Sequence, residues 1–158
     1  MNHAKEFTIT INNPVTELRK DLLPDDKGVY FICSAQRKEN GNYLIIRLLY
    51  IGRSNDVKDR VNGKHHKHNE ILKECKQDNG VPVYYYGSIE PDTNEDIARV
   101  EAALIFSKNP ILNDTANKGF HHPNTRIVLK RSQSSSQSNK KLPKAFGDTV
   151  FLVCRTEK

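Results

Sequence analysis

The chain has 158 residues, a length typical of one domain, and its three cysteines form no CxxC pair. No apolar stretch approaches the roughly 18 residues that a membrane-spanning helix needs, and the N-terminal residues lack the pattern of a secretion signal. Cys33 lies in an apolar run and is expected to be a buried free thiol, which favours a cytoplasmic, reducing location over a disulfide scaffold. The formal charge of +6 favours a polyanionic partner such as nucleic acid.

The first expected elements are a strand and a short helix. Residues 7–11 alternate apolar and polar side chains, as a half-buried strand does. Asn13 and Pro14 suit the N-cap and first position of a helix that would end near Pro24. We expect residues 1–26 to form an N-terminal extension that packs on the core.

Two strands, 28–35 and 43–51, are expected next, because both segments are apolar on both faces and thus typical of central strands. Asn40-Gly41 between them favours a hairpin. A three-residue loop would place Tyr30 directly opposite Tyr50, about 5 Å away on one face. A two-residue loop would put the two tyrosines on opposite faces. We favour the three-residue loop, because the chemistry considered below needs both tyrosines together and Gly41 suits a left-handed third position.

The later elements complete an α+β fold. Helices are expected over residues 55–62, 69–77 and 94–107, the last opened by a capping motif, and a third central strand over 81–86. Further strands over 127–129 and 149–153 would form a C-terminal hairpin extension, residues 115–158, with a flexible loop at 132–141. We therefore expect a small antiparallel sheet of about three strands, flanked by helices, in a core of residues 27–114.

Glu101 is the most informative single residue. It lies four residues after Ile97 and four before Ile105, within the apolar stripe of its helix. A carboxylate directed at the core is costly unless it is paired or binds a metal ion. A glutamate at the rim that pairs with an arginine is the structural alternative.

Arg60 and a histidine-rich segment are further candidates. Arg60 borders the inward side of its helix, and its planar guanidinium suits a phosphate, whereas a surface arginine packed over valines is the alternative. His65, His66 and His68 lack zinc-ligand spacing, so a basic phosphate-facing surface is favoured over a zinc site. One of these histidines could still transfer a proton.

Tyr30 and Tyr50 belong to the tripeptides Gly28-Val29-Tyr30 and Tyr50-Ile51-Gly52, and Gly52 would allow close approach to a ligand. Near a metal ion and an arginine, a tyrosine could lose its proton and activate water. Asn113 follows Asn109-Pro110, and its amide could hold a catalytic hydroxyl or only a turn.

Together these elements resemble the GIY-YIG nuclease family over about residues 27–114. The resemblance rests on five features in order: the two tripeptides, Arg60 in the next helix, Glu101 in a later helix, and Asn113 beyond a proline. Two departures are a longer hairpin and Lys64 where many members carry histidine or tyrosine, although His65 is adjacent. Residues after Asp114 have no counterpart in the family.

The resemblance implies a small three-stranded sheet and an endonuclease that hydrolyses DNA phosphodiester bonds with one divalent ion, Mg²⁺ or Mn²⁺. It implies that Glu101 binds the metal ion, Arg60 holds the phosphate and Asn113 orients its neighbours. Tyr30 is the favoured general base, but Tyr50 and His65 stay open for that role.

The residues expected to contact DNA are Gly52, Arg53, Lys64 and His68. A homodimer would let two sites cut both strands. The alternatives are an inactive nucleic-acid-binding module of the same fold and an interaction protein that shares only the fold.

Overall fold

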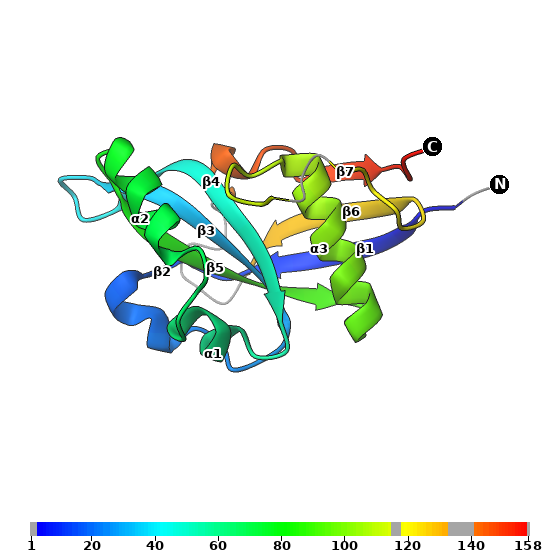
Figure 1. Ribbon diagram of the computed structural model, residues 1–158, viewed down its shortest axis with the longest axis horizontal. Coiled ribbons are helices and arrows are strands. Elements are labelled where there is room, and N and C mark those ends of the chain that lie inside the picture. Colours follow the sequence, from blue (N-terminus) through cyan, green and yellow to red (C-terminus); the bar gives the residue numbers. More distant parts are fainter. Residues whose placement is uncertain (1–2, 115–117, 133–140, 158) are drawn as a thin grey trace.

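A single curled β-sheet organises the chain (Figure 1). The computed structural model describes residues 3–114, 118–132 and 141–157, so the expected loop at 132–141 falls largely outside the described residues. The strands are β1 (Lys5–Ile11), β2 (Val15–Thr16), β3 (Gly28–Arg37), β4 (Tyr43–Ser54), β5 (Val81–Glu90), β6 (Thr125–Arg131) and β7 (Val150–Val153). Their order across the sheet is β4-β3-β5-β1-β6-β7, and β2 pairs with β5.

The expectation of a small three-stranded sheet was wrong, because the described part of the chain forms a seven-stranded mixed sheet. The three expected strands are present as β4, β3 and β5, all antiparallel. The free edge of β5 is then paired by β1, which also pairs in parallel with β6. The segments expected as terminal extensions therefore continue the central sheet and cover an edge that would otherwise expose unpaired backbone groups.

Three α-helices and two short 3₁₀ helices pack against the described part of the sheet. They are α1 (Val57–Asn62), α2 (His68–Gln77), α3 (Asn94–Lys108) and the 3₁₀ helices Glu17–Leu22 and Lys144–Phe146. In place of the helix expected after Asn13, the chain forms β2 and the first 3₁₀ helix. None of the helices in the described ranges is long and apolar enough to cross a membrane.

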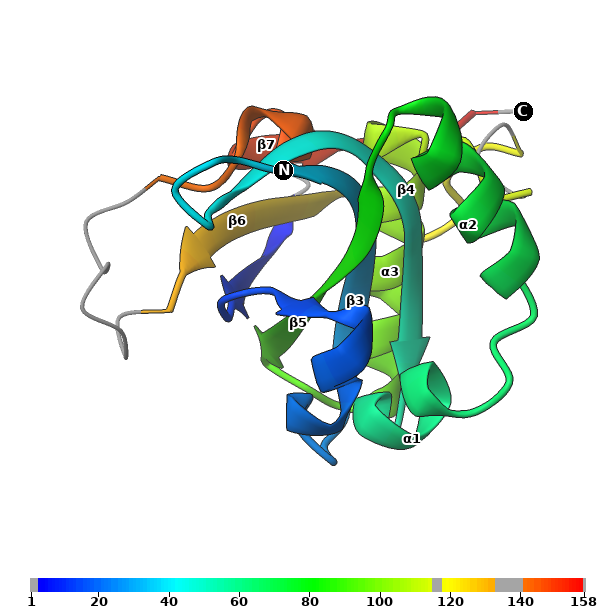
Figure 2. The ribbon, with the colours of Figure 1, turned by 90° about the vertical axis from the view of Figure 1, so that its left-hand side faces the viewer.

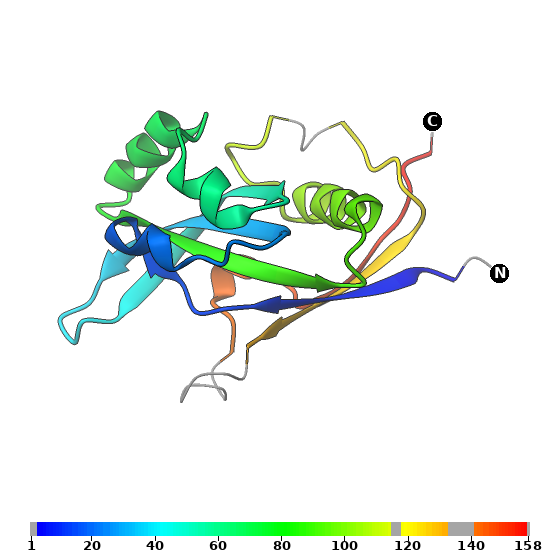
Figure 3. The ribbon, with the colours of Figure 1, turned by 90° about the horizontal axis from the view of Figure 1, so that it is seen from below.

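Alternate residues of β3 face two hydrophobic clusters. Val29 and Phe31 face a cluster that includes α3 residues such as Val100, whereas Tyr30 and Ile32 face a cluster that includes residues of α1 and α2. Figure 2 shows α1 and α2 beside β4, and Figure 3 shows α2 near one end of the molecule and α3 towards the other end. This double burial explains why the strand is apolar on both faces.

The β3–β4 hairpin has the expected three-residue loop, since the Lys38 backbone N–H donates to the Asn42 carbonyl at 2.7 Å. Two register shifts nevertheless follow, and each adds one residue to β4. Tyr50 consequently pairs with Ile32, and Tyr30 pairs with Gly52, so the expected direct Tyr30–Tyr50 pairing was wrong. Because two extra residues restore the alternation of side chains, both tyrosines still face the same side.

Candidate functional site

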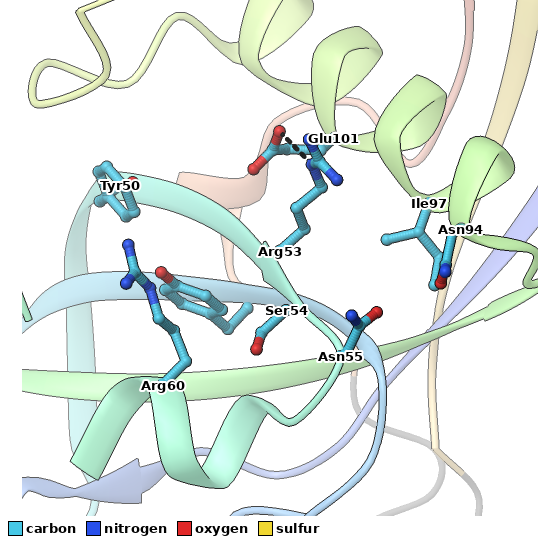
Figure 4. Close-up of a pocket in the computed structure, with 9 residues that line it drawn as sticks. Tyr50, Arg53, Ser54, Asn55, Arg60, Asn94, Ile97 and Glu101 are labelled. Carbon is cyan, nitrogen blue, oxygen red and sulfur yellow. Dashed lines mark hydrogen bonds and ion pairs between the residues drawn. The ribbon is translucent and has the colours of Figure 1, made fainter. Parts of the chain in front are cut away.

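A cleft of about 400 Å³ forms where edge strand β4 meets α1 and α3 (Figure 4). Among the expected site residues, Tyr30, Tyr50, Arg53, Arg60 and Glu101 all line it. They come from β3, β4, α1 and α3, so the fold brings together side chains that are far apart in the sequence. Since the described lining contains two arginines and one carboxylate, the cleft is suited to an anion.

Gly52 makes room for the Tyr30 side chain. The ring centroids of Tyr30 and Tyr50 lie 6.1 Å apart, and a Cβ atom built at Gly52 would overlap the Tyr30 ring. Gly52 is itself buried and has a packing role in the structure, and its expected contact with DNA stays a prediction. Gly52 thus leaves the space that the Tyr30 ring occupies.

His65 is buried beside Tyr30, and its hydrogen bonds determine its tautomer. The Lys67 backbone N–H donates to His65 Nδ1 at 3.1 Å, so Nδ1 carries no proton. His65 Nε2 then carries the proton and donates to the Tyr30 hydroxyl oxygen at 3.0 Å. Neither ring nitrogen of neutral His65 is free to accept a proton from the cleft, which removes it as a direct general base and leaves it to position Tyr30.

Burial controls protonation in this part of the site. Desolvation raises the pKa of Tyr30 and that of Tyr50, although the nearby charge of Arg60 lowers both. Desolvation also lowers the pKa of His65 to about 4, assisted by the charges of His66 and Arg60. The free protein therefore holds two neutral phenols and a neutral imidazole near neutral pH.

The low pKa of His65 predicts a dependence of stability on pH. The unfolded chain, with a His pKa near 6.5, binds more protons than the folded chain between pH 6.5 and about 4. The contribution of His65 to the free energy of unfolding is therefore complete above that window and is lost as the pH falls through it. We expect the loss to be smaller for His65→Gln, which keeps a donor and an acceptor but does not titrate. Urea unfolding of both proteins across the window checks this, and parallel slopes would contradict it.

Arg60 is exposed and extends from α1 into the cleft (Figure 4). Its Nη2 donates to His66 Nδ1 at 3.2 Å, and the His66 ring stacks on His65 with 4.8 Å between centroids. The guanidinium also hydrogen-bonds the Tyr30 hydroxyl, and its remaining N–H groups are left for a phosphate. The two histidines thus orient both Tyr30 and Arg60.

Glu101 forms an ion pair with Arg53 in this state, with 3.1 Å between Arg53 Nε and a carboxylate oxygen. The Glu101 side chain is 22% exposed and that of Arg53 is 50% exposed, so the arginine is free to move into solvent. Burial raises the pKa of Glu101 even though Arg53 lowers it. Glu101 therefore pairs with an arginine, as expected for a glutamate with a structural role. It also faces a cleft, as expected for a metal ligand.

Asn113 does not hold a catalytic hydroxyl. Its side-chain oxygen accepts from the Ile51 backbone N–H at 2.9 Å, and its Nδ2 donates to the Ile51 carbonyl at 2.8 Å. The Asn113 amide thus bonds the backbone of Ile51 at the free edge of β4 in the way that a neighbouring strand would. Asn113 positions the edge strand that carries the cleft, without lining the cleft itself.

Lys64 and His68 do not line this cleft but line a second cavity, together with His65 and His66. The expectation from sequence missed Ser54, Asn55 and Asn94, which line the cleft together with Ile97. Ser54 and Asn55 lie two and three residues after the second tripeptide, and this short distance in the sequence was the signal that could have indicated them. Asn94 begins α3 and had no such signal.

The single carboxylate of the cleft is compatible with a Mg²⁺ ion that keeps most of its waters. Within the described residues, no group of three or more histidine, cysteine or carboxylate side chains could form a protein cage for a metal ion. Mg²⁺ commonly binds through one or two carboxylates together with water and substrate phosphate, so one carboxylate facing an open cleft is compatible with it. Glu101 is the residue that could hold the ion, provided that Arg53 moves away.

No family model matches the sequence, and no curated protein or solved structure matches it. The residues and geometry of the cleft are therefore the basis on which a function can be inferred.

Proposed function

We propose that this chain is a metal-dependent endonuclease of the GIY-YIG type, which hydrolyses phosphodiester bonds in DNA. The observation that carries the proposal is the convergence of Tyr30, Tyr50, Arg60 and Glu101 on one cleft. Folding alone does not require two phenols, a guanidinium and a carboxylate from four separate elements to share a cavity. Buried free Cys33 and Cys75 favour a reducing compartment, and we place the protein in the cytoplasm.

In this proposal Arg60 binds the scissile phosphate and stabilises the negative charge that develops on it. Tyr30 accepts the proton of the attacking water, because its oxygen would be stabilised as a phenolate by the His65 N–H and the charge of Arg60. Tyr50 packs beside it and helps to orient the water. The high pKa of Tyr30 in the free protein means that its deprotonation depends on charge brought by the substrate complex.

A divalent ion held by Glu101 would supply that charge, since a bound cation lowers the pKa of nearby water and neutralises phosphate oxygens. The protein's part is to keep the carboxylate at the wall of the cleft and to release it from Arg53. DNA provides a reason for that release, because its phosphates compete for the guanidinium.

Arg53 and a divalent cation would compete for the Glu101 carboxylate. Arg53→Met is expected to bind Mn²⁺ about two- to fivefold more tightly than wild type without DNA, because an exposed ion pair stabilises by less than about 1 kcal/mol. Titration followed by electron paramagnetic resonance measures the affinity directly. Lys27→Met, which removes a charge outside the cleft, is the matched control. Equal or weaker Mn²⁺ binding by Arg53→Met would show that Arg53 does not block the carboxylate.

The Arg53–Glu101 ion pair also favours a second candidate, an inactive nucleic-acid-binding module of the same fold. In such a module the two side chains stay paired, and the cleft binds phosphate without cutting it. Binding would weaken steeply with salt in both cases, so only cleavage separates the two functions.

Incubation with plasmid, single-stranded and branched DNA, in Mg²⁺ or in chelator, tests the proposed function. The nuclease proposal predicts strand breaks in at least one DNA form, with Mg²⁺ only. Salt-sensitive binding to all forms without any Mg²⁺-dependent break would support the inactive module instead.

A further inference from the structure

We propose that the second cavity binds an unpaired nucleotide next to the scissile phosphate, so that the nuclease acts on DNA with a single-stranded or displaced segment. This inference rests on the proposed function and specifies its substrate. The cavity has a volume of about 470 Å³ and lies between the first 3₁₀ helix, the loop after α1 and the start of α2.

The charge of this second cavity suits a nucleotide. Its described lining includes Lys20, Lys64 and three histidines, with Glu17 as the single acid. Glu17 is already neutralised by Lys20 at 2.8 Å and accepts a hydrogen bond from the Tyr84 hydroxyl. Lys64 is exposed and forms no ion pair within the described residues, so its charge is available to a phosphate.

His65 and His66 connect the second cavity to two residues that line the cleft. His65 binds Tyr30 and His66 binds Arg60. Both histidines also line the second cavity, and the His66 ring is exposed. A nucleic acid held by Arg60 at one phosphate would therefore bring its neighbouring nucleotide to the second cavity, where the His66 ring offers a surface for base stacking.

Stacking of a base on the His66 ring argues against duplex DNA. A base that stacks on this ring must first leave its own stack in the DNA strand. An unpaired nucleotide has already lost its pairing and enters at a lower energetic cost.

Fluorescence anisotropy in chelator tests this pocket without relying on cleavage. Wild type is expected to bind a short single-stranded oligonucleotide more tightly than the duplex of the same sequence. Lys64→Ala should weaken single-strand binding about tenfold and duplex binding by less than about threefold. Lys73→Ala removes the same charge from an exposed site on α2 outside the cavity, and it should change neither affinity by more than about twofold.

A second variant, Asn69→Trp, fills the cavity without removing charge and should cause the same selective loss. Equal losses of affinity for single strand and duplex, or a preference of the wild type for duplex, would overturn the proposed nucleotide pocket. Cleavage of the same oligonucleotides in Mg²⁺ separates the two proposals. Equal cutting of paired and unpaired DNA would overturn the substrate inference alone, whereas selective single-strand binding without any cutting would overturn the nuclease function alone.

Discussion

Glu101→Gln is expected to lower DNA cleavage by at least about 10³-fold while the protein stays folded, since charge stabilisation through a bound metal ion is worth several kcal/mol. The amide has the same shape as the carboxylate but is a poor ligand for Mg²⁺, and it cannot neutralise the ion. Single-turnover cleavage of labelled DNA in Mg²⁺ measures the loss.

The fold should tolerate this change because burial already opposes the charge of Glu101. The substitution removes only the ion pair with half-exposed Arg53, so the free energy of unfolding should change by less than about 1 kcal/mol. Glu95→Gln, at an exposed position on the same helix, is the matched control and should keep full activity. Unchanged cleavage by Glu101→Gln would refute the assigned role of the carboxylate.

Arg60→Lys should have the second-largest effect, a loss of cleavage of about 10²- to 10³-fold, as is typical when one stabilising donor is removed. Lysine keeps the positive charge but lacks the planar fork that donates to two phosphate oxygens at once. Lysine also cannot reproduce the hydrogen bond that the rigid guanidinium of Arg60 donates to His66 Nδ1.

Because the charge is retained, DNA affinity in chelator should change by less than about threefold for Arg60→Lys. The loss should therefore appear in the single-turnover rate and not in binding. Arg126→Lys on β6, far from the cleft in the sheet order, is the control and should leave both quantities unchanged. Equal losses of DNA affinity and cleavage rate would show that Arg60 attracts DNA through its charge and has no role in the cleavage step.

Local patterns predicted the parts of the structure that depend on neighbouring residues. Helix α3 begins as expected, because the Thr93 side chain accepts a hydrogen bond from the Asp96 backbone N–H. The buried strands β3 and β5 follow from their apolar composition. The apolar stripe of α3 also placed Glu101 on its inward side, whereas the shared face of Tyr30 and Tyr50 was expected from a direct pairing that the structure does not have.

Long-range pairing was not predictable in this way. The parallel pairing of β1 with β6 joins Lys5 to Thr125, and no local pattern encodes a contact across that separation. Nor did the hairpin sequence indicate the two extra residues that move Tyr50 from Tyr30 to Ile32. The expected core of three strands therefore became the first half of a larger sheet.

The detailed roles of the site residues also needed three-dimensional information. Asn113 was a candidate because of its place after Pro110, but only the structure reveals that it binds the backbone of Ile51. Similarly, His65 was open as a general base until its Nδ1 was found to accept the Lys67 backbone N–H. Such assignments depend on hydrogen-bond direction, which a sequence pattern does not contain.

The central claim is that Glu101 holds a divalent ion beside the phosphate that Arg60 binds. The most direct test is Mn²⁺ binding, followed by electron paramagnetic resonance, to wild type and Glu101→Gln in complex with DNA that carries an uncleavable linkage. The account predicts one tightly bound Mn²⁺ per wild-type chain and none for Glu101→Gln, with DNA bound equally by both. Equal Mn²⁺ binding by the two proteins would contradict it.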